Sequence, residues 1–273
     1  MIFDGKAFAQ ELEKQLFYKA TNLPAQAGLV KKPKIVSILV GSDPASELYT
    51  RLKSEAAKRC GIEFEVIRLA GEQDIAGVVR RLSETADGIM VQLPIPGLQG
   101  QTLQDILVTI PLDKDVDGLR WEESGMMPAT VKAILAILDK IAERKSSDHS
   151  PRIAQGSELW NKKFVVVGAR GHIGKPLVHF LRERGAEVVE VEWDTSEPTR
   201  RVLEGEVVIS CVGRAGVVTG EMVKEGVVAI DVGSPKGDMT EDVYQKARVV
   251  VRSPGGVGPV TIACLMENAV SMV

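Results

Sequence analysis

The sequence predicts an α/β protein built on parallel sheets. Short apolar runs that suit buried strands alternate with longer segments of helical periodicity along the 273 residues. This length allows one large domain or two ordinary ones. The polar segment "ERKSSDHSPRIAQGSE" at 143–158 lacks periodicity, and the strand pattern restarts directly after it. We therefore expect an exposed linker there, and with it a candidate domain boundary.

The individual elements follow from apolar periodicity and from the turn residues between the runs. Strands are expected at 34–40, 63–69, 88–91, 163–168, 187–192, 206–212, 227–232 and 248–252. Helices are expected at 5–20, 44–60, 73–85, 101–109, 128–144, 173–184 and 259–272. Because strands and helices alternate, the order of the elements favours parallel pairing.

Composition narrows the class of protein. The formal net charge is -3 and the pI is about 5.8, so nucleic acid or an anionic membrane surface is not an expected partner. No apolar run approaches the ~20 residues of a membrane span, and the N-terminus has no signal-peptide pattern. The three cysteines are scattered without a C-x-x-C pair, and the three histidines show no metal-ligand spacing. A cytoplasmic protein without a metal is therefore expected.

The run "DGIMVQLPIPG", from Asp87 to Gly97, places a glutamine within an apolar strand. A buried amide without hydrogen-bond partners costs on the order of a few kcal/mol. Gln92 therefore either faces water where the strand ends or points into a binding site. The segment by itself favours the strand end.

The segment "VGSDPASELYTRLKSEAAKRCG" predicts a helix with a strong start, because Asp43 can cap it and Pro44 suits its first turn. Its buried stripe is expected at Leu48, Leu52 and Ala56. A polar stripe about 100° round the helix holds Ser46, Tyr49 and Lys53. This polar face is either solvated or a proton-transfer group beside Gln92, since a partly desolvated lysine can have its pKa lowered toward neutrality.

The segment "IPLDKDVDGLRW" carries Asp113, Asp115 and Asp117 at every second position. The glutamate of a calcium-binding EF-hand loop is missing. In an extended segment the three carboxylates would point the same way, so at least one is expected to have a specific partner. The alternatives are a solvated loop and a carboxylate that accepts hydrogen bonds from a ligand with adjacent N–H groups, such as a pterin.

The segment "FVVVGARGHIGKPL" predicts a strand, a glycine-rich turn and a helix. Gly168, Gly171 and Gly174 form G-x-x-G-x-x-G, one residue off the usual dinucleotide-binding spacing. Such a turn brings backbone N–H groups and a helix N-terminus up to a pyrophosphate. Acidic residues follow the last glycine at the expected distance: Glu190, Glu192 and Asp194. An acid there either holds a ribose 2′-hydroxyl, which favours NAD, or is an exposed strand end.

Together these segments resemble the bifunctional methylenetetrahydrofolate dehydrogenase/methenyltetrahydrofolate cyclohydrolase family. The motifs that carry the resemblance occur in the family's order and spacing: "VGSDPASELYTRLK", "DGIMVQLPIP", "DKDVDG", "VVVGARGHIGKP", "AIDVGS" and "PGGVGPVTIACLMEN". They cover nearly the whole chain, and "VQLPIP" and "PGGVGP" are specific to the family. These two motifs also argue against shikimate dehydrogenase-like enzymes, which share the two-lobe plan.

The resemblance implies two lobes. Residues 1–125 would form an α/β folate lobe, joined by the last helix at 259–273 packing back on it. Residues 126–258 would form a Rossmann-type lobe with a doubly wound parallel sheet. It also implies a homodimer that oxidises 5,10-methylenetetrahydrofolate with a nicotinamide cofactor. The same enzyme of one-carbon metabolism would then hydrolyse the methenyl product to 10-formyltetrahydrofolate.

The resemblance also assigns residues to roles. Lys53 would be the general acid/base, with Gln92 touching it and Tyr49 beside the folate ring. The substrate-binding residues would be Ser46, Tyr49, Gln92, Leu93, Asp117, Pro254 and Gly255, with Asp117 on the pterin amino group. The cofactor-binding residues would be Gly168, Ala169, Arg170, Gly171, His172, Ile173, Trp193, Gly213 and Ser234.

The cofactor half departs from the family pattern. Arg170 stands where the family usually has serine, and 192–195 replaces the segment that often helps bind the NADP 2′-phosphate. The family default is NADP. Arg170 could supply the lost positive charge, whereas Glu192 and Asp194 would oppose a phosphate and make NAD possible. The alternatives are a cyclohydrolase alone or a folate-binding protein that has lost hydride transfer.

Overall fold

The computed structural model describes residues 1–21, 32–70, 74–96, 102–143, 158–192 and 194–273. These residues form two compact units. The three-stranded unit comprises Ala9–Ala129 and Ile262–Val273, and the five-stranded unit comprises Met1–Phe8 and Thr130–Thr261. Most of the linker expected at 143–158 lies outside the described residues.

The first residues of the chain group with the five-stranded unit, whereas the sequence analysis placed them in the N-terminal lobe. The Phe3 amide donates to the Val250 carbonyl at 2.8 Å, and the N-terminal ammonium donates to the Arg248 carbonyl at 2.7 Å. The N-terminal residues thus pair with the segment at 248–250, far away in the sequence. Local periodicity cannot reveal such a pairing.

The three-stranded unit is built on the parallel sheet order β2-β1-β3. Its strands are β1 (Lys34–Val40), β2 (Glu63–Leu69) and β3 (Gly88–Val91). Alternate residues of β1 face two apolar clusters, with Ile35 in one and Val36 and Ile38 in the other. Because both faces are covered, the central strand is mostly apolar, with Ser37 as the one polar residue inside it.

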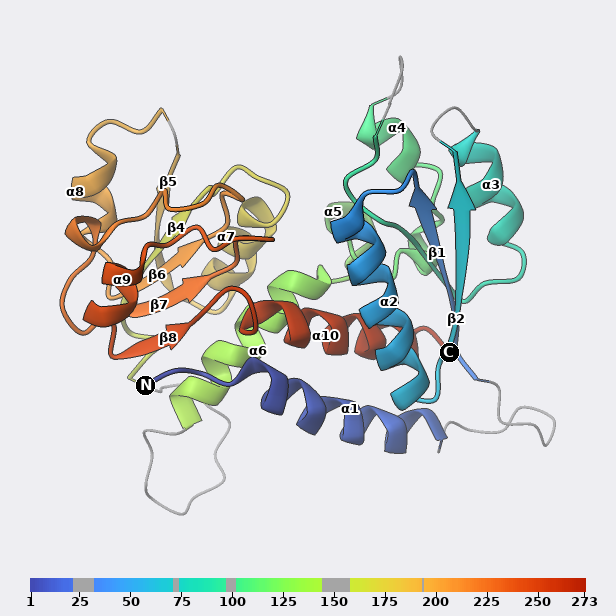
Figure 1. The fold of residues 1–273 in the computed structure, drawn as a ribbon, viewed down its shortest axis with the longest axis horizontal. Coiled ribbons are helices and arrows are strands. Elements are labelled where there is room, and N and C mark those ends of the chain that lie inside the picture. The colour runs from blue at the N-terminus through green and yellow to red at the C-terminus, as the bar shows by residue number, and fades with distance from the viewer. Residues whose placement is uncertain (22–31, 71–73, 97–101, 144–157, 193) are drawn as a thin grey trace. The chain divides into compact units, whose positions relative to one another are not determined.

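Helices cover the two faces of this sheet (Figure 1). The cluster around Ile35 includes residues of α1 (Gly5–Thr21), α2 (Pro44–Arg59) and the last helix α10 (Val257–Ser271). The cluster around Ile38 includes residues of α3 (Ile75–Leu82) and α4 (Leu103–Leu107). The part of α10 from Ile262 onward is therefore core of the three-stranded unit, which confirms that the last helix packs back on this lobe.

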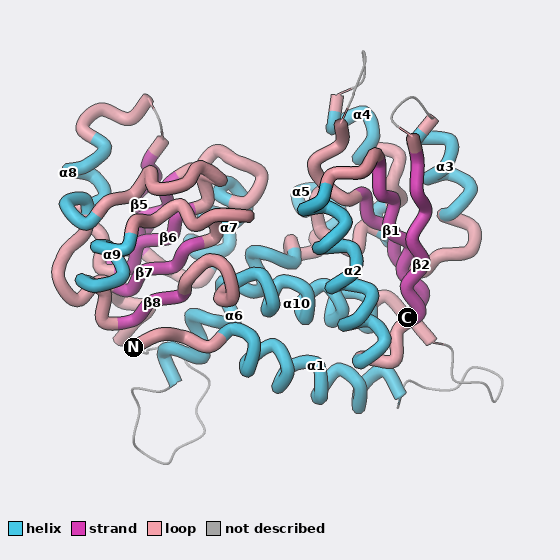
Figure 2. Tube along the Cα trace, viewed as in Figure 1, coloured by secondary structure: helices cyan, strands magenta, loops and turns pink. Residues whose placement is uncertain are grey.

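The five-stranded unit has the all-parallel order β5-β4-β6-β7-β8. Its strands are β4 (Lys163–Val167), β5 (Glu187–Val191), β6 (Val207–Ser210), β7 (Val228–Asp231) and β8 (Val249–Val251). Figure 2 shows these strands among the helices α6 (Ala129–Glu143), α7 (Gly174–Glu183), α8 (Pro198–Val202) and α9 (Glu241–Lys246). The strand order reverses between β4 and β6, which is where ligands bind in doubly wound sheets.

The predicted strands and long helices are all present, with ends that differ by a few residues. The elements that the sequence analysis did not predict are short: α5 (Trp121–Ser124), α8, α9 and the 3-10 turns at Leu112–Lys114 and Gly220–Met222. Runs of three to six residues span less than two helical turns, so they have no amphipathic period to detect.

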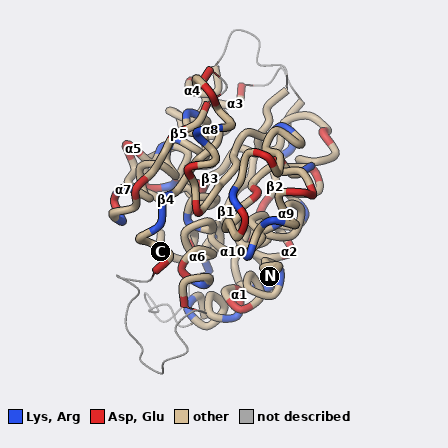
Figure 3. The backbone as a smooth tube through the Cα atoms, turned by 90° about the vertical axis from the view of Figure 1, so that its left-hand side faces the viewer, with Lys and Arg blue, Asp and Glu red and all other residues tan. Residues whose placement is uncertain are grey.

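Charged residues of both signs are spread over the chain. Figure 3 shows acidic and basic positions interspersed, and the chain has 34 Lys and Arg residues against 37 Asp and Glu residues. Within the described ranges, no helix combines the length and the apolar character that crossing a membrane requires. Over the same ranges, no group of three or more His, Cys, Asp or Glu side chains is arranged to hold a metal ion.

Candidate functional site

A buried lysine and a glutamine meet in the three-stranded unit. The Lys53 ammonium on α2 donates to Gln92 Oε1 at 2.9 Å, just beyond the end of β3, and lies 4.0 Å from the Met90 sulfur. Both residues are only 8% exposed. The Gln92 amide nitrogen in turn donates to the Leu93 carbonyl at 2.8 Å, so both ends of this amide have partners. Gln92 therefore points at Lys53 and is not a solvated strand end.

Burial changes the acidity of this lysine. Desolvation disfavours the ammonium and lowers the pKa of Lys53, while the charge of Asp117 acts in the opposite direction. The neutral amine is thus more accessible than in an ordinary surface lysine, which suits a group that must both accept and donate a proton.

The start of α2 agrees with the sequence prediction, but the face of the helix that is buried does not. The Asp43 carboxylate caps the helix by accepting from the Ser46 amide at 2.8 Å. Leu48, expected in the buried stripe, is 44% exposed, and Leu52 is only partly buried. Ala56 is buried as predicted, and the other buried residues of α2 are Ser46, Thr50, Lys53 and Ala57, with Tyr49 half-buried.

The reason lies in how close this helix approaches the sheet. Ala56 and Ala57 are fully buried against the cluster around Ile35, and such small side chains allow a short distance between helix and sheet. Positions 46, 50 and 53 continue the same face toward the helix N-terminus, because they follow at helical spacing. The hydrogen bond to Gln92 offsets part of the desolvation of Lys53.

The acidic turn separates its three carboxylates. The segment is not extended, because a 3-10 turn at Leu112–Lys114 interrupts it, but the expectation that at least one carboxylate has a specific partner is confirmed by Asp115. Asp113 is exposed, Asp117 is half-buried and Asp115 is only 1% exposed. Asp115 accepts from the backbone amides of Leu119 at 3.2 Å and Arg120 at 2.8 Å. Burial raises the pKa of Asp115 despite these bonds.

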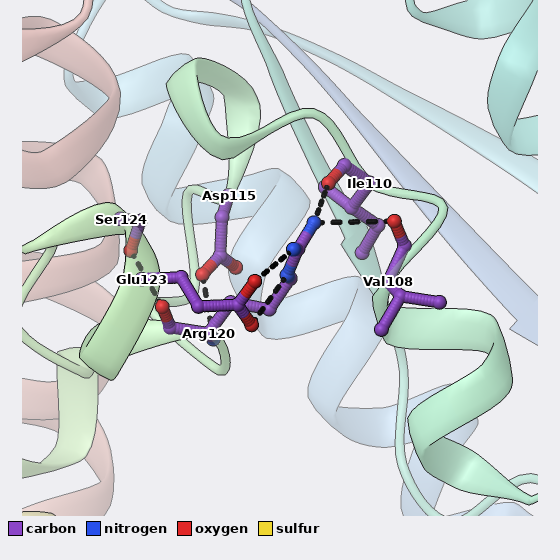
Figure 4. Close-up of polar contacts among 6 residues, drawn as sticks. All are labelled: Val108, Ile110, Asp115, Arg120, Glu123 and Ser124. Carbon is purple, nitrogen blue, oxygen red and sulfur yellow. Dashed lines mark hydrogen bonds and ion pairs between the residues drawn. The ribbon is translucent and has the colours of Figure 1, made fainter.

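Arg120 ties this loop to its surroundings (Figure 4). Its guanidinium donates to the carbonyls of Val108 at 3.2 Å and Ile110 at 2.7 Å, and pairs with the Glu123 carboxylate. The loop carrying Asp117 is thereby held on both sides. Sequence reasoning missed Arg120, because two of its partners are backbone carbonyls, which leave no signature in the sequence.

Two glycines of the glycine-rich turn in the five-stranded unit stand where a side chain would be strained. Gly168 has a φ of +80°, and a Cβ at Gly174 would lie 2.0 Å from the Gly168 carbonyl oxygen. Ala169 is buried, His172 is exposed, and Ile173 directly precedes α7. The bare backbone at the start of α7 fits the close approach of a pyrophosphate, so the turn suits a dinucleotide.

Arg170, at the tip of this turn, is already paired. Its backbone amide donates to the Glu192 carboxylate, and its guanidinium contacts the carboxylate of Asp194 and lies 4.0 Å from that of Glu192. The cation and both acids weighed for cofactor choice therefore interact with one another. Trp193, between the two acids, lies outside the described residues.

The remaining predicted residues of this unit share one edge of the sheet. Gly213, Ser234 and Pro254 each lie three residues beyond the end of β6, β7 and β8, and Gly255 follows with a φ of +102°. The carboxyl ends of parallel neighbouring strands meet at one edge. The structure therefore gathers these residues at the edge that carries the glycine turn after β4.

Comparison with known proteins agrees with this geometry. Residues 3–117 match the tetrahydrofolate dehydrogenase/cyclohydrolase catalytic domain, and residues 153–273 match the NAD(P)-binding domain of the same family. The bifunctional protein FolD of Streptococcus uberis is 33% identical over 98% of this chain and 95% of its own length.

Two solved structures are similar along the full chain. The bifunctional FolD enzyme of Campylobacter jejuni has a TM-score of 0.85 and 29% identity, covering 100% of this chain and 98% of its own. The Trypanosoma brucei enzyme, solved with NADP and an inhibitor, has a TM-score of 0.86 and 29% identity, covering 100% and 96%. The shikimate dehydrogenase-like alternative is thereby set aside. The motifs, the fold and the relatives of this chain agree that it belongs to the tetrahydrofolate dehydrogenase/cyclohydrolase family.

Proposed function

We propose that this protein oxidises 5,10-methylenetetrahydrofolate with NADP and then hydrolyses 5,10-methenyltetrahydrofolate to 10-formyltetrahydrofolate. The observation that carries the proposal is the buried Lys53 ammonium, 2.9 Å from Gln92 Oε1. A lysine costs free energy to bury, and a hydrogen bond to a neutral amide leaves its proton available for transfer.

In the hydrolytic step, water attacks the methenyl carbon and passes one proton to neutral Lys53. As the carbonyl of the formyl group forms, the bond from this carbon to N5 breaks. The Lys53 ammonium returns its proton to N5, and the second water proton leaves to solvent. Gln92 holds the lysine in place through Oε1, and Tyr49, on the same face of α2, lies beside the folate ring.

In the oxidative step, NADP, when bound, would supply the acceptor for the hydride of the methylene carbon. The contribution of the chain is binding and orientation. The glycine turn before α7 would hold the pyrophosphate, and Gly213 and Ser234, in the loops after β6 and β7, would line the cofactor site. The family match and the intact turn favour a full bifunctional enzyme over a cyclohydrolase alone or a folate-binding protein. We also propose that the enzyme is cytoplasmic and that it is a homodimer. Sedimentation would test the homodimer, because the mass of one chain is 29.5 kDa.

Two absorbance assays test this function. Methylenetetrahydrofolate and NADP should produce the reduced cofactor, and methenyltetrahydrofolate alone should lose its absorbance faster with the enzyme than without it. Hydrolysis without reduction of NADP or NAD would favour the cyclohydrolase alternative. Absence of both activities in the folded protein would contradict the proposal.

Asp117→Asn should weaken folate binding. A charge-assisted hydrogen bond to the pterin would contribute about 1.5–3 kcal/mol, which corresponds to an affinity loss of about tenfold or more. Loss of this carboxylate also removes the charge that raises the pKa of Lys53. The inflection of the cyclohydrolase pH–rate profile should therefore move to lower pH. Asp113→Asn, exposed on the same loop, is the matched control. Unchanged folate affinity in Asp117→Asn would indicate a merely solvated carboxylate.

Arg170→Ala should raise the Michaelis constant for NADP by about tenfold or more and leave that for NAD nearly unchanged. The Arg170 guanidinium is a cation that could meet a 2′-phosphate, but it contacts the Asp194 carboxylate. A phosphate must therefore displace this carboxylate, so Asp194→Asn should lower the constant for NADP. Equal losses with both cofactors in Arg170→Ala would mean that Arg170 holds the turn or the pyrophosphate instead.

A further inference from the structure

Two buried carboxylates lie beneath the carboxyl edge of the five-stranded sheet. Asp231 ends β7, Asp238 follows it in the loop before α9, and both are 0% exposed. Neither belongs to the residues that the family motifs assign to cofactor or folate. A buried carboxylate is costly unless its oxygens accept hydrogen bonds, so the groups that satisfy it indicate what it holds.

Asp238 holds the loop after β6. Its Oδ2 accepts from the backbone amides of Val212 at 2.8 Å and Gly213 at 3.2 Å, and from the Ser210 hydroxyl at 2.8 Å. Ser210 is the last residue of β6, and the two amides belong to the loop directly beyond it. Hydrogen bonds from backbone amides to a carboxylate are charge-assisted and stronger than those between neutral groups. One oxygen thus fixes both the end of the strand and the direction of its loop.

Asp231 holds Asp238 and the loop after β7. Its Oδ1 accepts from the Gly233 amide at 3.0 Å and from the Asp238 amide at 2.9 Å. Its Oδ2 accepts from the Met239 amide at 3.0 Å and from the Tyr244 hydroxyl at 2.6 Å. All four acceptor contacts are therefore used within a stretch of fourteen residues, and the position of Asp238 depends on Asp231.

The loop after β8 joins the same network through Ser253, whose hydroxyl donates to the Gly233 carbonyl. Gly233 is also confined by the carboxylates. A Cβ at this position would lie 2.4 Å from Asp238 Oδ1 and 2.5 Å from the Asp238 amide nitrogen. The loops after β6, β7 and β8 are thereby linked through two carboxylates and one glycine.

We propose that Asp238 is a positioning residue for the dinucleotide cofactor, fixing the Val212–Gly213 backbone at the ligand-binding edge of the sheet while Asp231 holds Asp238. The inference rests on the proposed function, because it takes Gly213 as a cofactor contact. Asp238 itself is buried and reaches the cofactor site only through the two amides that it fixes.

Asp238→Ala removes the acceptor for both amides at once. The dissociation constant of NADPH, measured by fluorescence titration, and the Michaelis constant for NADP should rise by about tenfold or more. The turnover number at saturating NADP should change much less, and cyclohydrolase activity should remain at the wild-type level, because Lys53 and Gln92 belong to the other unit. A role in stability alone predicts a lower unfolding temperature with unchanged NADPH affinity, and that result would overturn the proposal.

Three further variants make the test specific. Ser210→Ala removes a donor to the same oxygen but leaves both loop amides bound, so its NADPH affinity should stay near that of the wild type. Asp238→Asn retains an oxygen that can accept from the amides and should recover most of the affinity. Gly233→Ala forces a methyl group against Asp238 and should weaken NADPH binding while cyclohydrolase activity persists.

The outcomes separate clearly. If Asp238→Ala does not fold, unchanged NADPH affinity in Gly233→Ala would overturn the proposal. A loss in Ser210→Ala as large as that in Asp238→Ala would also overturn it, since the network would then act without regard to the loop. If the wild type lacked both activities, the proposed function would fail, yet the NADPH titrations would still decide whether Asp238 positions a dinucleotide.

Discussion

Replacing Lys53 by methionine is expected to abolish methenyltetrahydrofolate hydrolysis while folate binding remains detectable. Methionine has nearly the same length and suits the buried environment, but it can neither accept the proton of water nor return one to N5. Desolvation lowers the pKa of Lys53, so the wild-type side chain can act as a base. The methionine side chain has no ionisable group that could replace it. The effect should therefore fall on the rate of hydrolysis and much less on folate affinity.

The decay of methenyltetrahydrofolate absorbance measures this rate directly. Lys58→Met, on the exposed face of the same helix, is the matched control and should hydrolyse like the wild type. Gln92→Ala should leave an intermediate rate, because the lysine remains but loses the acceptor that orients it. A wild-type rate in Lys53→Met would refute the assignment of Lys53.

The same substitution should make the protein more stable at neutral pH. The folded-state pKa of Lys53 lies below its unfolded value of 10.5. Between these two values the unfolded chain binds more protons, so the free energy of unfolding of the wild type rises with pH. The variant lacks this dependence. Its advantage in unfolding temperature should be largest below the folded-state pKa and should shrink as the pH approaches 10.5.

Gly174→Ala is expected to remove most dehydrogenase activity and leave cyclohydrolase activity intact. The added Cβ would lie 2.0 Å from the Gly168 carbonyl oxygen and 2.8 Å from the Ala169 Cα. Both neighbours are backbone atoms, so the whole turn must shift and its amides would no longer converge on a pyrophosphate. The loss should be seen both in NADPH binding and in the rate of cofactor reduction.

Gly171→Ala provides a graded comparison. Its Cβ would lie 3.3 Å from the same oxygen, a contact that a small shift can relieve, so its loss of NADPH affinity should be much smaller. Equal losses in the two variants would mean that Gly171 is needed for its own approach to the cofactor. Wild-type affinity in Gly174→Ala would exclude a pyrophosphate at this turn.

Local signals account for most of what could be predicted. The long strands and helices have regular periods, and the start of α2 is encoded by Asp43 and Pro44 in adjacent positions. The glycine turn is equally local, because its strand, its turn and its helix are consecutive. For the Lys53 and Gln92 pair, the family motifs supplied the expectation, and the structure supplied the 2.9 Å bond between side chains 39 positions apart.

The sequence alone determined the α/β class, the positions of the regular elements and the family, since periodicity and motifs depend on neighbouring residues. Only the tertiary structure decided that the polar face of α2 is buried and that Leu48 is exposed. It also decided that Asp115 supports the acidic turn and that Asp238 holds amides 25 and 26 positions away. The physical reason is that a polar side chain can be buried only where distant parts of the chain supply its hydrogen-bond partners, and no local pattern records which parts will meet.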